Sequence, residues 1–413
     1  MLSRVVVTGM GLLTPVGNDV LSTWEALCQG KSGVGPITSY DTSQLRVHFG
    51  AEIKNFDPSR YMDRKTIRHT DPYEHFAVAT AKEALTQSGL EITQENADDV
   101  GVYIGSGVGG LTTYHDQFQV LYEKGPDRVS PYLPTMSIVN AAPGFISILT
   151  GAKGPNWGTV SACATSSNSI GEAWETIRRG DAKAMIAGGS EKGLTLIAMA
   201  AFENMHAISR RNDDPPGASR PFDATRDGFV MGDGSGMLIL EELDFARSRG
   251  ATILAEIVGY GSTADAYHVT EPAHGGTGLV RAMRRALQKA GLHPGQVDYI
   301  NAHGTSTPFN DRTETQAIKS CFGEYAFRVP ISSTKSMTGH MMGASGAAEA
   351  IFCVMSILTG VIAPTINLHH PDPECDLDYV PNEAREAEVR VAMSNSMGFG
   401  GHNACLIFKQ FEE

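Results

Sequence analysis

Cys163 is the first residue whose setting suggests chemistry. Residues 154–158 form a cluster of turn residues, and 159–160 continue them as a short apolar run. Apolar residues at helical spacing over 169–180 then predict a helix. A strand-to-helix bend of this kind lifts a side chain out of the backbone. It also points free N–H groups and the positive end of the helix at the sulfur, which favours thiolate. Cys163 is therefore a candidate nucleophile, with a buried structural cysteine as the alternative.

Three further stretches offer matching chemistry. His303 ends a predicted strand, and His340 ends the hydroxyl-rich run 332–339. Residues 394–401 are predicted to form a glycine loop able to offer backbone N–H donors. Loops that leave the carboxyl ends of parallel strands gather around one crevice. A nucleophile, two imidazoles and such donors suit acyl transfer through a thioester. Taken singly, each histidine could instead be a structural residue whose ring nitrogens are hydrogen-bonded, and the glycine loop could be a tight turn.

The elements that must position these residues occur twice along the chain. The first half has predicted strands at 4–11, 100–107, 184–191 and 237–241, with a helix at 76–90. The second half has predicted strands at 255–261, 297–304 and 400–408, a helix at 279–292 and a strand–loop–helix at 331–358. Alternating strands and helices predict an α/β protein with mainly parallel sheets covered by helices. The repeat predicts two similar halves, 1–250 and 251–413.

Two long stretches lack periodicity. Residues 209–236 are rich in Asp, Pro, Gly and Arg, and a loop of this length inside a compact protein is usually functional. Residues 106–140 contain three prolines and are predicted to be irregular. We expect this second stretch to cover the other half or a symmetric partner subunit.

Composition excludes several classes of function. A net charge of −13 argues against nucleic-acid binding. Two modest basic clusters, 64–68 and 210–220, could face an acidic partner or be ordinary solvated surface. The six scattered cysteines form neither a disulfide framework nor a zinc site, which predicts a reducing cytoplasm and no metal. The N-terminus lacks the features of a signal peptide.

One apolar segment, 342–363, has about the length of a membrane span. It contains Glu349 and many small residues, and it breaks at Gly360 and Pro364. A helix buried inside a large soluble protein explains it better than insertion, so no membrane association is expected.

Four motifs in order support a family resemblance. They occupy 161–165, 301–308, 333–340 and 395–401, with further matches at 219–223 and 226–232. Together they resemble the elongating β-ketoacyl-[acyl-carrier-protein] synthases, and among these the type II enzymes, from end to end. The resemblance implies a thiolase-like fold, in which two duplicated α/β halves form a five-layer α-β-α-β-α sandwich. It also implies a homodimer.

The resemblance implies the chemistry as well. The Cys163 thiolate would take an acyl group from carrier protein, with the backbone N–H groups of Cys163 and Phe399 as the oxyanion hole. His303 and His340 would stabilise the enolate left when malonyl-carrier protein loses CO₂. Attack of this enolate on the acyl-Cys163 would give a 3-oxoacyl chain two carbons longer, as in fatty acid elongation. No cofactor is required, because the substrates are carried on the phosphopantetheine of acyl carrier protein.

Supporting roles follow from matched positions. The resemblance implies that Lys335 and Glu349 orient His340, and that Thr305 and Thr307 bind the pantetheine arm. It places Val108, Phe202, Phe399 and Met397 at the acyl pocket and its gate. It assigns docking of the carrier protein to Lys65, Arg68 and Arg128. Lys335 and Glu349 could equally form a structural ion pair. The chain departs from the family pattern with Met397 in place of a second Phe, and at 69–73, Asn204, His206 and Asn310.

Other functions stay open at this point. A polyketide-type ketosynthase would use the same chemistry on other chains. A degradative thiolase uses a second cysteine where His340 stands, and a chain-length factor lacks the nucleophile. A Cys–His hydrolase would need an orienting acid motif, which is missing.

Overall fold

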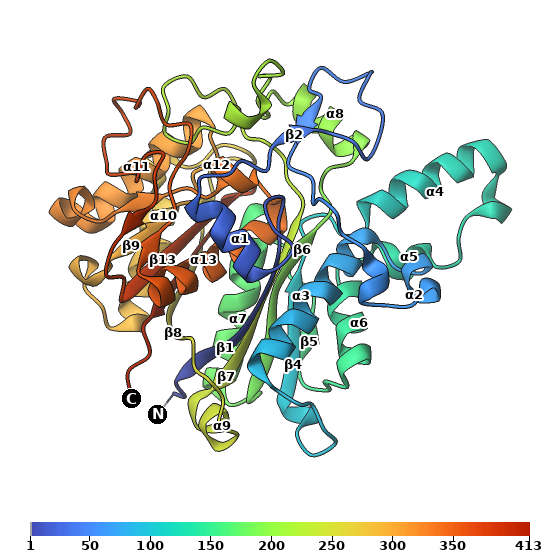
Figure 1. Ribbon diagram of the computed structural model, residues 1–413, viewed down its shortest axis with the longest axis horizontal. Coiled ribbons are helices and arrows are strands. Elements are labelled where there is room, and N and C mark those ends of the chain that lie inside the picture. The colour runs from blue at the N-terminus through green and yellow to red at the C-terminus, as the bar shows by residue number, and fades with distance from the viewer. Residues whose placement is uncertain (1) are drawn as a thin grey trace.

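A ten-stranded sheet runs through the protein, whose computed structural model describes residues 2–413 (Figure 1). The strand order is β10-β9-β13-β14-β8-β1-β7-β6-β4-β5. These strands are β1 (Val5–Leu13), β4 (Val100–Gly105), β5 (Asn156–Trp157), β6 (Ala184–Glu191), β7 (Gly234–Glu242), β8 (Ala255–Ala264), β9 (Tyr299–Asn301), β10 (Ile331–Ser332), β13 (Val391–Gly398) and β14 (His402–Lys409). Two small ladders pair β2 (Gly35–Pro36) with β3 (Phe49–Gly50), and β11 (Val361–Ile362) with β12 (Arg385–Glu386).

The sheet consists of two sets of five strands with the same topology. Read inward from each edge, the orders are β5-β4-β6-β7-β1 and β10-β9-β13-β14-β8. In both sets the outer three strands are parallel, and the inner pairs are antiparallel. The sets join only where Val5, Val6 and Val7 of β1 pair with β8. The division at residue 250 stays a prediction, because the sheet is continuous.

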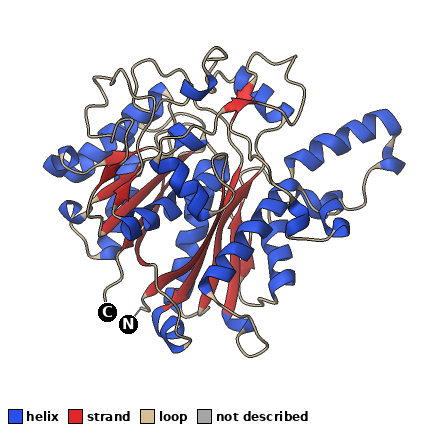
Figure 2. Cartoon of the chain, viewed as in Figure 1, coloured by secondary structure: helices blue, strands red, loops and turns tan. Residues whose placement is uncertain are grey.

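Helices complete five layers. In the middle, α7 (Thr165–Arg179) and α13 (Ser345–Thr359) contact strands of both sets. The outer faces are covered by α3 (Pro72–Ser88) and α6 (Ala141–Thr150) on the first set, and by α10 (Thr277–Ala290) and α11 (Pro308–Phe322) on the second. Figure 2 shows the strands in two groups with helices between and outside them. The predicted α-β-α-β-α sandwich is confirmed.

The remaining helices lie around this core. They are α1 (Val20–Cys28), α2 (Arg64–Arg68), α4 (Leu111–Lys124), α5 (Leu133–Ser137), α8 (Leu196–Asn204), α9 (Leu243–Ser248) and α12 (Lys335–Thr338). The long segment 209–236 has little regular structure beyond a 3₁₀ turn at Pro215–Gly217, as its composition indicates.

The apolar helix near residue 350 is the centre of the core. By length and composition Met342–Thr359 could cross a membrane, but 83% of it is buried inside the protein. It lies very close to α7, because a Cβ added at Gly346 would be 2.1 Å from Ser167 Oγ. Its interpretation as a buried helix therefore agrees with its position between the two sets of strands.

Two predictions about secondary structure are wrong. The sheets are not mainly parallel, since five of the nine neighbouring strand pairs are antiparallel. The glycine loop predicted at 394–401 is mostly strand: β13 continues to Gly398 and turns within three residues into β14, with Gly398 opposite His402. Glycines that permit a tight hairpin turn thus produce an antiparallel pair where a glycine loop was expected.

The stretch 106–140 is helical rather than irregular. Helix α4 occupies its first part and projects from the body of the molecule (Figure 1). Tyr114, Phe118 and Tyr122 recur every four residues along α4, and all three are exposed. The prolines that suggested disorder instead stand outside α4, at Pro126 and beyond.

Candidate active site

A tight turn presents the thiol of Cys163. It is a single 3₁₀ turn, Ala162–Ala164, that leads directly into α7. Ala162 has a φ of +51°, a left-handed conformation that is unfavourable for a residue with a Cβ. The turn is held because Ser161 N–H donates to Thr165 Oγ1 at 2.9 Å. The expected sharp bend is present, but residues 159–160 before it are not a strand.

The two histidines, both from the second half of the chain, lie next to each other. Their ring centroids are 5.5 Å apart, with the planes at 85°. His303 follows β9, and its N–H donates to Glu314 Oε1 at 2.8 Å. His340 is held by backbone bonds to the long 209–236 segment: its N–H donates to Val230 O at 2.7 Å. Its Nδ1 lies 3.0 Å from Ser345 Oγ.

One cavity of about 370 Å³ brings most of the predicted site residues together. Its lining includes Cys163, His303, His340, Thr305, Thr307, Phe202, Met397 and Phe399. Lys335 and Glu349 lie behind it. Val108 does not line it and is 43% exposed, so its role in an acyl pocket stays a prediction.

Burial makes both imidazoles neutral. It lowers the pKa of His303 and of His340 well below the usual value, and the Lys335 cation lowers both pKa values further. His303 Nδ1 is buried and has no hydrogen-bond partner among residues 2–413. A buried polar atom without a partner is rare unless a ligand uses it. The site thus holds two uncharged imidazoles, one of them with a free ring nitrogen.

The thiol is not activated in the way the sequence predicts. Burial raises the pKa of Cys163 to about 11. Lys335 and the hydrogen bonds from the N–H groups of Phe399 and Cys163 to the sulfur lower this pKa, but by less than burial raises it. The expected preference for thiolate is therefore wrong for the unliganded site. The two N–H groups nevertheless lie beside the sulfur, next to where the carbonyl oxygen of a group bound to it would carry negative charge.

Close approach of the β13 hairpin makes this convergence possible. A Cβ added at Gly398 would lie 2.6 Å from Ser161 O and 3.1 Å from Cys163 N. A larger residue at 398 would push the turn away from the thiol. Ser396 of the same strand contacts Ser167 of α7, with 2.8 Å between their hydroxyl oxygens.

Lys335 and Glu349 form a buried ion pair between α12 and α13, with side chains 1% and 2% exposed. Burial raises the pKa of Glu349 to about 7 against the lowering effect of Lys335. The structural alternative from the sequence is thus present, and through its charge Lys335 also acts on the thiol and both imidazoles. Orientation of His340 by this pair stays a prediction, because its direct contacts are Ser345 and the backbone at 230–232.

A row of aromatic rings lines the cavity wall. Phe399 lies 6.4 Å from Phe202, Phe202 lies 5.4 Å from Phe229, and Phe229 lies 5.5 Å from His340, measured between ring centroids. Sequence reasoning missed Phe229, although the run 226–232 was recognised as a family match. It also missed Met342, which lines the cavity with a φ of +46°.

The predicted docking residues lie outside the cavity. Lys65 and Arg68 are on α2, whose N-terminus is capped by Asp63. Just after α2, His69 stacks on Tyr132 with 3.8 Å between ring centroids. Arg128 is in the 3₁₀ turn Pro126–Arg128 that follows α4. The shared docking role of these three basic residues stays a prediction.

A thiol held beside two uncharged imidazoles, inside a thiolase-like sandwich, is the arrangement of an acyltransferase-type condensing enzyme. The chain belongs to the β-ketoacyl synthase family. Residues 2–246 match "Beta-ketoacyl synthase, N-terminal domain", and residues 254–369 match "Beta-ketoacyl synthase, C-terminal domain".

Whole-chain relatives agree with this membership. The chain is 53% identical to "3-oxoacyl-[acyl-carrier-protein] synthase 2" of Synechocystis sp., over 99% of this chain and 98% of the relative. It is also 53% identical to the protein of that name in Staphylococcus aureus, over 99% of both chains. Among solved structures, a β-ketoacyl synthase from Burkholderia phymatum is 38% identical, covering 99% and 100% of the two chains with a TM-score of 0.91. A type II polyketide ketosynthase in complex with its acyl-carrier protein is 32% identical over 100% of both chains, with a TM-score of 0.92.

The neutral state of the imidazoles can be tested by NMR. Because their pKa values are lowered, His303 and His340 should stay uncharged as the pH falls from 8 through 6.5, and they should take up protons only well below that. Imidazole ¹⁵N chemical shifts in histidine-labelled protein report this, with His303→Asn and His340→Asn variants used for assignment. Protonation of either ring near pH 6.5 would contradict the electrostatics described above.

Proposed function

We propose that this protein is a 3-oxoacyl-[acyl-carrier-protein] synthase of type 2, which extends fatty acyl chains by decarboxylative condensation. The observation that carries the proposal is the shared cavity of Cys163, His303 and His340, with two backbone N–H groups directed at the sulfur. Identity of 53% over the whole length to enzymes of that name supports the same reaction.

In the first half-reaction the sulfur of Cys163 attacks the thioester carbonyl of acyl-carrier protein. The developing oxyanion is bound by the N–H groups of Cys163 and Phe399, each such donor being worth about 2.7–4 kcal/mol. The C–S bond to the carrier's pantetheine breaks, and the proton lost by Cys163 ends on the departing pantetheine sulfur. Because the resting thiol has a pKa of about 11, only a small fraction of Cys163 is thiolate at neutral pH.

In the second half-reaction malonyl-carrier protein occupies the same cavity. Its carboxylate leaves as CO₂, and the electron pair of the broken C–C bond forms an enolate. Neutral His303 and His340 donate hydrogen bonds to the thioester oxygen on which this charge develops. The enolate carbon attacks the acyl carbonyl, the C–S bond to Cys163 breaks, and a 3-oxoacyl product leaves. The released Cys163 thiolate then takes up a proton from solvent, which restores the thiol. Neutral imidazole donors suit this step, because they stabilise the enolate without protonating it readily.

This chemistry needs no redox or metal cofactor, since loss of CO₂ drives formation of the C–C bond. We place the protein in the cytoplasm, where its six free cysteines would stay reduced; cell fractionation checks this placement. A polyketide-type ketosynthase is the second candidate, favoured by the likeness to the solved polyketide enzyme. The higher identity to the synthase 2 relatives supports fatty acid elongation over it. Cys163 argues against a non-catalytic chain-length factor.

Mass spectrometry of the intact protein tests the reaction. Incubation with acyl-carrier protein should add one acyl group to Cys163, and malonyl-carrier protein should then remove it as a chain two carbons longer. Both steps should proceed in the presence of a chelator. Cys163→Ala should abolish the adduct, lowering condensation by at least about 10³-fold. Release of free fatty acid without extension would indicate a hydrolase, and no adduct on the native protein would indicate a non-catalytic partner.

Acyl carrier protein is the proposed partner. A related ketosynthase has been solved in complex with its acyl-carrier protein. Lys65 and Arg68 offer cations on the short surface helix α2, suited to an acidic protein, and Arg128 offers another beyond α4. We propose that the partner contacts both α2 and the turn that carries Arg128.

Charge reversal tests this docking surface. Arg68→Glu should raise the KM for acyl-carrier protein by about five- to tenfold, and 0.5 M salt should reduce the difference. The KM for acyl-pantetheine, which has no carrier protein, should not change. Lys183→Glu is the matched control, because Lys183 precedes the N-terminal end of β6, opposite the end that approaches the site. Equal effects of the two variants, or an equal effect on acyl-pantetheine, would rule out docking at α2.

We further propose a homodimer formed through the edge of the first set of strands. Strand β5 is the outermost strand and pairs only with β4, so its other edge is unpaired. Large apolar side chains are exposed on and around it, namely Ile138, Ile148, Leu149, Trp157 and Val160. An exposed apolar area next to an open strand edge is typical of a subunit interface.

Sedimentation measures the dimer. The native protein should sediment with the mass of two chains, and Ile148→Asp should shift it toward one chain. Ile148 is 79% exposed in the single chain, so the substitution should not unfold it. Leu21→Asp is the matched control, because Leu21 is 75% exposed on α1 and should leave the mass unchanged. A native mass of one chain would refute the dimer.

A further inference from the structure

We propose that Arg226 is a positioning residue for the pantetheine arm of the substrate. Its guanidinium fixes the backbone segment that brings Thr305 and Thr307 to the cavity wall. The inference rests on the proposed function, because the arm belongs to the proposed substrate. Arg226 itself does not line the cavity, so it acts through the segment that it holds.

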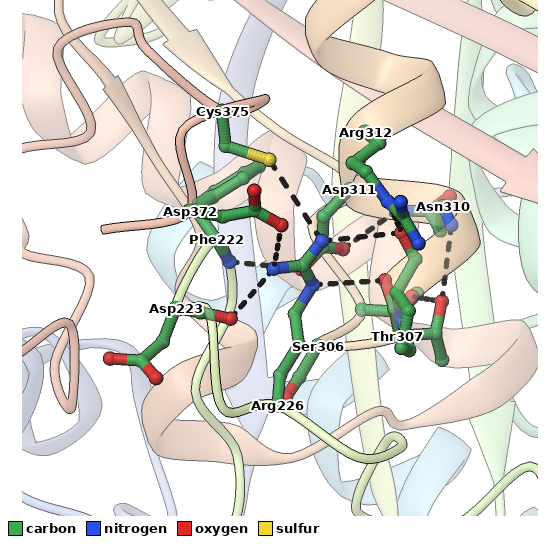
Figure 3. A network of polar contacts seen from close by, with 12 residues as sticks. Phe222, Asp223, Arg226, Ser306, Thr307, Asn310, Asp311, Arg312, Asp372 and Cys375 are labelled. Atoms are coloured by element: carbon green, nitrogen blue, oxygen red, sulfur yellow. Dashed lines mark hydrogen bonds and ion pairs between the residues drawn. The ribbon is translucent and has the colours of Figure 1, made fainter. Parts of the chain in front are cut away.

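The guanidinium binds this segment directly (Figure 3). Arg226 Nε donates to Thr307 O at 3.2 Å, and Nη2 donates to Pro308 O at 3.2 Å. Nε also lies 3.1 Å from Asp311 Oδ2, and Nη1 lies 2.8 Å from Asp372 Oδ2. The side chain is only 2% exposed. Nη1 also donates to Asp223 O at 2.6 Å. One planar cation thus binds three backbone carbonyls and two carboxylates at once, which the forked geometry of arginine permits and lysine cannot reproduce.

The held segment needs such support. Between the end of β9 and the start of α11 the chain has no regular structure. Ser306 has a φ of +70°, which is unfavourable for a residue with a Cβ, and Gly304 has a φ of +36°. Thr305 and Thr307 are linked to each other, with 3.0 Å between their hydroxyl oxygens. A strained segment keeps its path only where the surroundings hold it. Arg226 binds its last carbonyl, that of Thr307, and shares with Arg312 Nε the carbonyl of Pro308, the first residue of α11.

The catalytic histidine at the start of the same segment is held independently. The N–H groups of His303 and Gly304 donate to the carboxylate of Glu314, each at 2.8 Å. Loss of Arg226 contacts should therefore displace the threonines more than the imidazole. This separation gives the proposal a specific kinetic signature, in which binding of the arm weakens while the reacting groups stay in place.

Arg226 also joins two opposite walls of the cavity. It belongs to the long 209–236 segment, whose next residues Asp227, Gly228 and Phe229 line the cavity. Its two carboxylate partners and the carbonyls of Thr307 and Pro308 belong to the second half of the chain, and Thr307 and Pro308 line the cavity. The guanidinium therefore sets the spacing between 227–229 and 305–308, through which the arm would pass.

Kinetics of Arg226→Lys test the proposal with two probes. For acyl-pantetheine, the KM should rise about tenfold with a smaller change in kcat, because binding of the arm is weakened. Iodoacetamide has no arm, so its rate of alkylation of Cys163 should change by less than about twofold. Arg249→Lys is the matched control: Arg249 also binds a carboxylate and a backbone carbonyl, Glu241 and Ser88 O, but none of these lines the cavity.

A double-mutant cycle with Thr305→Val tests the route of the effect. If Arg226 acts through the threonines, the double variant should show a KM close to that of the worse single variant. Additive effects, an unchanged KM, or a parallel loss of alkylation rate would overturn the proposal. Should Arg226→Lys fail to fold, Asp372→Asn removes one charge partner with little change of shape and should raise the KM in the same direction.

The outcomes also separate this inference from the proposed function. If acyl-pantetheine acylates the native protein and the Arg226→Lys variant has the same KM as the native protein, only the positioning role is refuted. If the native protein is not acylated at Cys163 at all, the proposed function fails, and the inference that rests on it fails too.

Discussion

The contact between α7 and α13 is the constraint on which the site depends. Cys163 stands directly before α7 and His340 five residues before α13, so the separation of these helices sets the separation of thiol and imidazole. The helices approach closely because Gly346 has no side chain against Ser167, and Ala347 N–H donates to Ser166 Oγ at 2.8 Å. Small residues and hydroxyls at this crossing, rather than any contact inside the cavity, bring residues from the two halves of the chain together.

That central position also determines the electrostatics. A site between two sets of strands is removed from water, and burial disfavours every charged form. The same effect therefore raises the pKa of Cys163 and lowers those of His303 and His340. Lys335 opposes the first shift and reinforces the other two. Lys335, a buried cation paired with Glu349, thus favours neutral imidazoles and also lowers the pKa of the thiol.

The sequence predicts the parts of this structure that depend on local pattern. The long strands, α3, α10 and α13 were predicted because apolar periodicity and glycine stops mark them, and ordered motifs indicated Cys163, His303 and His340. The direction of strand pairing was not predictable, because it depends on which strands meet after the chain returns. Helix α4 was not predicted for another reason. The prolines that follow it indicated irregular structure, although its aromatic residues recur every four positions; these residues are exposed in the single chain. The pKa of Cys163 was misjudged because burial depends on the whole fold, whereas a helix N-terminus is predictable from the neighbouring sequence.

Two buried carboxylates explain how irregular loops can line a buried cavity. Loops outside strands and helices leave backbone N–H groups that must find acceptors. Glu314 accepts from His303 and Gly304, while Glu191 accepts from Gly107 at 2.6 Å and Gly343 at 2.9 Å. A carboxylate suits this task because it has two acceptor oxygens and, when ionised, acts only as an acceptor. The charge of Glu191 also raises the pKa of Cys163, so the group that fixes the loops opposes ionisation of the thiol. The thiol and the two imidazoles therefore start uncharged, and the fixed N–H groups and imidazoles stabilise negative charge where the reaction generates it.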